Sequence, residues 1–183
     1  LSQKENFKIP VSVTLFLDMG YTSMKPELMY AGIVKDFETN ELHRFNYFSQ
    51  LIIASKLSSW LSLEILPSYL HRNFVSQRIN ENGLAEDQNG LFSLGIGGRI
   101  KLTKRMCLIA DYFYNFDPFY VNNPSAFNPL AIGFEMETGG HVFSMFFTNS
   151  AALIENSFIP YTSDTWTKSQ IKFGFCISRT FAL

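Results

Sequence analysis

The chain has 183 residues, a length that fits one domain, and its formal net charge is −1 without a run of basic residues, which gives no electrostatic support for nucleic-acid binding. Aromatic residues make up 16% and charged residues only 17%, while the mean hydropathy is +0.03. The chain is therefore neither polar enough to be disordered nor apolar enough to be a helical membrane protein. No segment approaches the ~20 apolar residues that a membrane helix needs.

Eight segments alternate apolar and polar residues with a period of two, the pattern of a β-strand with two different faces. In chain order they cover residues 11–19, 43–57, 60–73, 91–102, 106–116, 129–138, 141–149 and 169 onwards. In the clearest of them, Phe92, Leu94 and Ile96 alternate with a serine and two glycines. Most of the segments are close to the ~9–11 residues with which a tilted strand crosses a bilayer.

The connections between these segments alternate strictly between long and short. Four are long (20–42, 74–90, 117–128 and 150–168), and three are short (57–59, 103–105 and 138–140). Outer-membrane barrels show this asymmetry, with short periplasmic turns and long extracellular loops. We therefore predict an all-β fold, an antiparallel up-and-down transmembrane β-barrel, as one domain over residues 1–183. Eight strands are visible, and both ends of the chain lie on the short-turn side.

The alternation alone does not decide which face meets lipid, because a soluble barrel can point the same apolar residues inward. Aromatic residues near the strand ends on the apolar faces favour lipid outside, since such residues form interfacial girdles: Tyr21, Tyr69, Tyr112, Tyr114 and Phe181. The opposite faces carry charges of both signs, which can pair inside a narrow barrel. The chain begins at Leu1, so we expect any signal peptide to have been removed or to lie outside this sequence.

Four charged residues fall on the predicted lumen face of three consecutive strands: Arg99, Asp111, Glu135 and Glu137. We expect them to form a salt-bridge network that fills the barrel. A charged constriction lining a pore is the alternative, and it needs a lumen wider than eight strands give. A pair of carboxylates acting as acid and base comes third, because nothing suggests a sugar-binding cleft.

The connection 150–168 is unusually apolar for an exposed segment, and five of its residues are candidates for contact with a partner: Leu153, Ile154, Phe158, Ile159 and Trp166. The loop can fold over the barrel mouth, dip into the membrane interface or dock a partner. The connection 20–42 is similarly apolar, and we expect a short helix within residues 26–36.

The histidines and cysteines give no catalytic or metal-binding pattern. His43 and His71 fall on the apolar faces of adjacent strands without a serine or aspartate of suitable parity, so we interpret them as interfacial residues. His141 follows the tight glycine turn and is expected to be a turn or interface residue. Cys107 and Cys176 lie on strands that are not neighbours in sequence, and we expect two free, buried thiols. We predict no catalytic residue, cofactor or metal site.

Five stretches resemble an uncharacterised family of Bacteroidota outer-membrane β-barrels: LIIASKL, LPSYLHRNFV, GIGGRIKLTKR, METGGHVFSMFFTNS and IKFGFCISRTFAL, which begin at Leu51, Leu66, Gly95, Met136 and Ile171. Cys176 stands where the family usually has Asn, and Phe146 where a polar or smaller residue is common. The resemblance covers essentially the whole chain and implies a fold and a location, without an activity. Family members are longer, which implies that this chain is the C-terminal part of a barrel of about 12–14 strands.

The function expected from these features is structural. We predict a protein of the bacterial outer membrane that contacts outer-membrane lipid, anchors or completes a cell-envelope assembly, and binds a protein partner through its long extracellular loops. A passive or selective channel is the second hypothesis, favoured if the complete protein has about twelve or more strands. A barrel-embedded enzyme is third, because no triad is visible.

Overall fold

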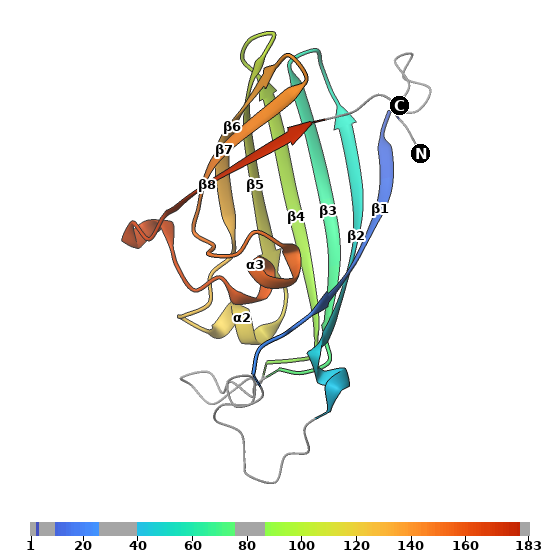
Figure 1. The fold of residues 1–183 in the computed structure, drawn as a ribbon, viewed down its shortest axis with the longest axis vertical. Helices are drawn as coiled ribbons and strands as arrows, with labels where there is room; N and C mark the ends of the chain where they lie inside the picture. The colour runs from blue at the N-terminus through green and yellow to red at the C-terminus, as the bar shows by residue number, and fades with distance from the viewer. Residues whose placement is uncertain (1–2, 4–9, 26–39, 76–86, 180–183) are drawn as a thin grey trace.

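A computed structural model describes residues 3, 10–25, 40–75 and 87–179, and within them eight strands form one antiparallel sheet in the order of the chain (Figure 1). The strands are β1 (Ser12–Tyr21), β2 (Phe45–Lys56), β3 (Leu61–Arg72), β4 (Gly90–Lys101), β5 (Met106–Asn115), β6 (Leu130–Thr138), β7 (His141–Thr148) and β8 (Lys172–Arg179). Each strand pairs with the next, so the predicted meander is confirmed.

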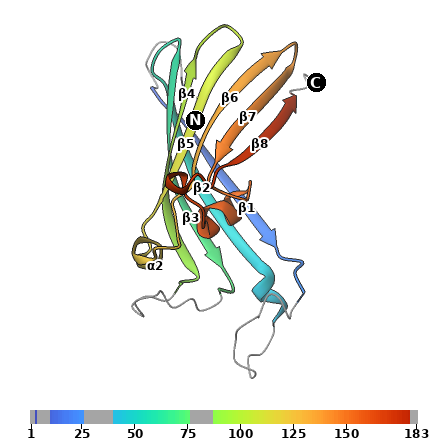
Figure 2. The same ribbon diagram turned by 90° about the vertical axis from the view of Figure 1, so that its left-hand side faces the viewer.

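The sheet curls into an open trough (Figures 1 and 2). Among the described residues β1 pairs only with β2, and β8 pairs only with β7, so the two edge strands are not joined to each other. The visible part of the barrel is thus a half-barrel with a convex and a concave face. No helix in the described ranges is long and apolar enough to cross a membrane.

The connections divide between the two ends of the sheet as predicted. At the short-turn end, the β6–β7 hairpin turns on Gly139 and Gly140, whose φ angles are +52° and +100°, values that L-residues rarely adopt. The long-loop end carries four short helical segments: η1 (Glu41–Arg44), α2 (Pro118–Asn122), α3 (Glu155–Tyr161) and η2 (Trp166–Lys168). The helix expected within residues 26–36 lies outside the described residues.

Strand β2 begins two residues later than predicted, because His43 and Arg44 belong to η1. The Asn40 side chain accepts a hydrogen bond from the Leu42 amide and caps that segment, which stabilises a helical turn at these residues.

The two faces of the sheet differ as the period-two pattern predicted. Large apolar side chains project from the convex face and are widely exposed, for example Phe92 at 65% and Phe175 at 66%. On the concave face, small and polar residues alternate with a few large ones. Gly95 is one of the small residues, and a Cβ there would lie 2.5 Å from the Phe113 ring, so this glycine allows the ring to pack into the trough.

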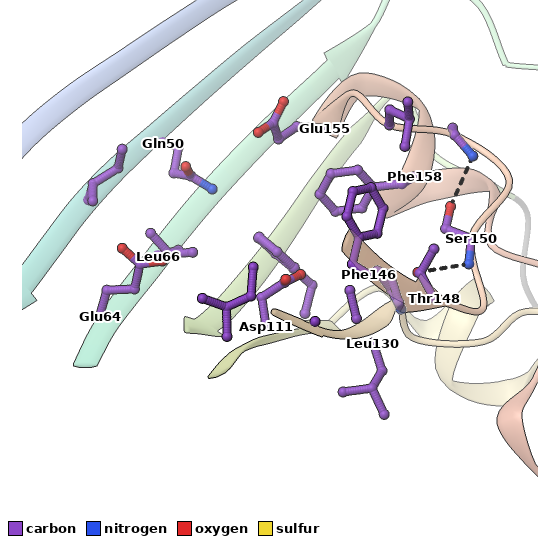
Figure 3. Close-up of a pocket in the computed structure, with 18 residues that line it drawn as sticks. Gln50, Glu64, Leu66, Asp111, Leu130, Phe146, Thr148, Ser150, Glu155 and Phe158 are labelled. Atoms are coloured by element: carbon purple, nitrogen blue, oxygen red, sulfur yellow. Dashed lines mark hydrogen bonds between the residues drawn. The ribbon is translucent and has the colours of Figure 1, made fainter. Parts of the chain in front are cut away.

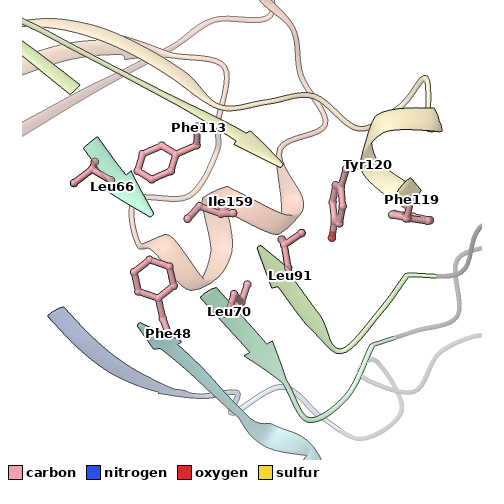
Figure 4. Close-up of a cluster of buried hydrophobic side chains, with 8 residues drawn as sticks. All are labelled: Phe48, Leu66, Leu70, Leu91, Phe113, Phe119, Tyr120 and Ile159. Carbon is pink, nitrogen blue, oxygen red and sulfur yellow. The ribbon is translucent and has the colours of Figure 1, made fainter. Parts of the chain in front are cut away.

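A compact cluster of buried apolar side chains lies inside the trough near its long-loop end (Figure 4). It joins residues of β2–β5 to residues of the two helices: Phe48, Leu66, Leu70, Leu91, Phe113, Phe119, Tyr120 and Ile159. The core of the described structure is therefore the packing of α2 and α3 against the inner wall of the barrel.

Candidate functional site

Helix α3 is the element that closes the mouth of the trough. Ile159 is only 1% exposed and packs into the buried cluster, and the Phe158 ring meets the Phe113 ring edge-on at 5.2 Å between centroids. Phe158 is partly buried and Ile159 fully buried, and both positions require α3 to lie against the concave wall. We call α3 and the residues around it, 150–168, the plug.

Polar contacts fasten the plug to strands on both sides of the trough. The Asn156 amide donates to a carboxylate oxygen of Asp18 on β1, and the Asn115 amide of β5 donates to the Ile159 carbonyl at 2.9 Å. In η2, which follows α3 in the chain, the Trp166 indole donates to the Leu130 carbonyl of β6 at 3.2 Å. The plug therefore bridges the trough from its first strand to its sixth.

A second set of contacts holds the long-loop end together around Arg72, the last residue of β3. Its guanidinium lies 2.7 Å from the Asp87 carboxylate and donates to the Tyr120 hydroxyl of α2 at 3.2 Å. It also lies 5.6 Å from the centroid of the Tyr161 ring of α3. Burial raises the pKa of the Tyr120 phenol above its usual range, so the phenol stays protonated. We call Arg72, Asp87 and Tyr120 the mouth cluster.

A cavity of about 350 Å³ lies inside the trough beneath the plug (Figure 3). Three carboxylates line it, those of Glu64, Asp111 and Glu155, and none of its described lining residues is basic. Room for Glu64 comes from the neighbouring strand, because a Cβ on Gly97 would collide with Glu64 Oε1. The cavity is therefore an acidic compartment that the plug separates from the long-loop end.

The four charged residues of the predicted network fall into two groups. Glu135 Oε2 lies 2.7 Å from Arg99 Nε, and Glu137 follows on the same face of β6. Asp111 lies apart from them in the acidic cavity. The strand register explains the separation, because Arg99 is paired with Ile109 and Glu135 with Cys107, and both of these β5 residues are nearer the short-turn end than Asp111. The single four-residue network is thus corrected to an Arg99–Glu135 ion pair with Glu137 nearby, and a separate carboxylate, Asp111.

The five candidate partner-contact residues also divide. Ile154 is 56% exposed and can meet a partner. Leu153 is 70% exposed, but it lines the acidic cavity. Ile159 and Phe158 face inward as part of the plug, and Trp166 is half-buried and bonded to β6. The expectation for Ile159 is therefore corrected, because its side chain is already used to fill the mouth.

No group of three or more His, Cys, Asp or Glu residues in the described ranges can hold a metal ion. The His43 ring lies 5.6 Å from the Phe74 ring, and the His141 ring lies 6.3 Å from the Phe143 ring. Cys107 and Cys176 are free thiols, as predicted. Cys107 is buried, but the expectation of burial is wrong for Cys176, which is exposed because the edge strand β8 has no neighbour on one side among the described residues.

Comparison with known families adds one finding to this geometry. A family model described as "Membrane bound beta barrel domain (DUF5777)" matches residues 1–181. The chain belongs to this family. The apolar convex face is thus the membrane-facing outer surface of the barrel. The resemblance to a β-barrel family of unknown function is confirmed. The Bacteroidota origin stays a prediction. No curated protein and no solved structure matches the chain.

Proposed function

We propose that this protein is a plugged outer-membrane barrel that anchors a cell-envelope assembly and has no chemistry of its own. The observation that carries the proposal is the plug. Ile159 is buried in a cluster that holds residues of four strands of the inner wall, and the plug is hydrogen-bonded to β1, β5 and β6. A mouth closed in this way favours a scaffold over an open pore.

The long-loop end offers a surface for the partner that an anchor requires. Large apolar side chains are exposed there, on segments that lie beyond the strands: Met24, Leu42, Val121 and Ile154. Exposed apolar patches of this kind mark protein interaction sites. In the proposed outer-membrane orientation, this end is extracellular.

The anchoring role is tested by replacing Val121 and Ile154, both exposed, with Asp and purifying the full-length protein from native membranes after mild cross-linking. We expect the double variant to lose a partner that wild type retains in stoichiometric amount. Ser163→Asp is the matched control, because Ser163 is an exposed residue of the same loop as Ile154. Equal recovery of the partner with the double variant, or no stoichiometric partner with wild type, rejects the role proposed for this surface.

A channel is the second candidate, and the acidic cavity favours it. Glu64, Asp111 and Glu155 without a basic neighbour among the described lining residues give a lumen that attracts cations. In planar bilayers, the anchor proposal predicts no conductance steps for wild type. Cation-selective steps that weaken in the Glu64→Gln, Asp111→Asn variant support the channel instead.

A further inference from the structure

The side chains on the convex face differ in size, and two adjoining hollows lie between the larger ones across β1–β4. The first has a volume of about 470 Å³, and its walls include Leu15, Leu51 and Leu94. The second has a volume of about 370 Å³, lies one step nearer the long-loop end, and is lined by Met19 and Tyr47 among others. Both hollows share Ser49 and Tyr69, so they form one groove.

Two short side chains create this groove. Ser49 is paired with Leu17 on one side and Tyr69 on the other, and Pro67 is paired with Leu94. Both stand among large apolar neighbours. The β2–β3 pairing is also interrupted between Gln50 and Ile53, next to Pro67, which has no N–H to donate to a ladder. The wall is therefore recessed at the middle of these strands.

The surroundings of Ser49 keep the groove open. The Tyr69 ring lies 4.6 Å from the Phe92 ring, and Gly90 leaves room for its hydroxyl, because a Cβ there would lie 2.8 Å from that oxygen. Tyr69 is thus packed against β4 and does not collapse over Ser49. The one carboxylate next to the groove among the described residues is that of Asp18, which is bonded on the concave side to Asn156.

We propose that this groove binds one acyl chain of a membrane phospholipid. The groove is continuous with the lipid-facing surface of a membrane-bound barrel, and its walls are mostly apolar, which suits the hydrocarbon of an acyl chain. The chain lies over Pro67 and Ser49, and the headgroup lies beside Tyr47 and His71, which line the loop-end hollow. Tyrosine and histidine at this depth suit the polar interface of a bilayer.

The first test fills the groove with Ser49→Phe and counts bound lipid by native mass spectrometry. The full-length protein is delipidated in mild detergent and titrated with palmitoyl-oleoyl phosphatidylethanolamine. We expect one preferentially bound lipid in wild type and about tenfold weaker binding in the variant, the effect of losing roughly two methylene contacts. Ala110→Phe is the matched control, because Ala110 is a small residue on the convex face of β5 outside both hollows.

A second measurement does not depend on filling the groove. With Trp60 and Trp166 replaced by Phe, Leu94→Trp places a single fluorophore in the groove wall, and Ile132→Trp places one on the convex face of β6 outside both hollows. In vesicles of chain-brominated phospholipid, we expect stronger quenching of the first, because a chain seated in the groove stays in contact with the ring. Equal quenching of both overturns the proposal. The proposal is also overturned if Ser49→Phe and Ala110→Phe weaken lipid binding equally. It is overturned as well if Ser49→Phe disrupts a dimer of the protein and leaves lipid binding unchanged.

Discussion

The side chain of Arg72 is only 3% exposed. Its guanidinium donates hydrogen bonds to the Asp87 carboxylate, the Tyr120 hydroxyl and the Gln88 carbonyl. Its burial is tolerable only because these groups compensate the charge. Replacing Arg72 with Met leaves the Asp87 carboxylate buried without a cation. We expect the free energy of unfolding to fall by about 3–5 kcal/mol, measured by urea titration in lipid vesicles.

The control for Arg72 is the double variant Arg72→Met, Asp87→Leu, in which neither charge remains. Because buried ion pairs are often replaceable by apolar residues, we expect this variant to recover most of the lost stability. A double variant as unstable as Arg72→Met contradicts the assignment of the loss to an unpaired carboxylate.

Ile159 gives a second prediction at the residue scale. Truncation to Ala opens a cavity where four strands meet α3, and we expect a loss of about 2–5 kcal/mol in the free energy of unfolding. Ile154→Ala, at an exposed position of the same loop, is expected to change stability by less than about 0.5 kcal/mol. The same denaturant titration measures both, and similar losses at the two sites would mean that α3 does not occupy the mouth.

The sequence predicted which residues face the lumen but not which of them meet. Parity along each strand placed Arg99, Asp111 and Glu135 on one face. Contact between them depends on the stagger between neighbouring strands, and the alternation pattern leaves that stagger open. The mouth cluster was not predicted as a unit either, because Asp87 and Tyr120 belong to two different long connections without periodicity.

At the scale of elements, the β6–β7 hairpin depends on Gly140, whose φ of +100° disfavours a side chain. A Cβ there meets nothing within 4 Å, so the effect of a substitution is purely conformational. We expect Gly140→Val to lower the free energy of unfolding by at least about 1–2 kcal/mol and to slow refolding into vesicles. Ser58→Ala in the first short turn is expected to have the smaller effect, and the reverse order would contradict the turn geometry.

Elements with a strict pattern were predicted within a few residues, and elements without one were not. The strands follow from alternation, and the Gly-Gly turn from its composition. Helices α2 and α3 have 5 and 7 residues, too few to show a helical period. The sequence showed that the loop 150–168 was apolar and left open whether it covers the barrel mouth, enters the membrane interface or docks a partner. The structure places it in the mouth, because its apolar residues pack against the inner wall.

At the scale of the whole molecule, the described eight strands need completion. Among the described residues, β1 and β8 each have a strand neighbour on one side only, and open sheet edges do not occur in lipid. An eight-stranded barrel also has an interior that side chains alone fill, whereas this trough holds a helix. Since β1 and β8 run in opposite directions, only an even number of added strands keeps every neighbour antiparallel. We therefore expect an even total above eight, consistent with the 12–14 strands implied by the sequence resemblance.

This expectation is tested by amide hydrogen exchange of the full-length protein in lipid vesicles. We expect peptides from β1 and β8 to be protected as strongly as those from β3 and β4, because all of them are paired on both sides in the complete barrel. Fast exchange confined to β1 and β8 would contradict closure by added strands.

The hydrogen bond between Asn156 and Asp18 joins residues 138 positions apart in the chain. Contacts of such long range form slowly, because a large loop must close before they stabilise anything. The plug contacts β1, β5 and β6, so it can make all of these contacts only when the sheet has curled enough to bring β1 opposite α3. We therefore expect apolar residues inside the trough to stay accessible to water until the plug docks, which makes the sealing of the mouth a late step of folding.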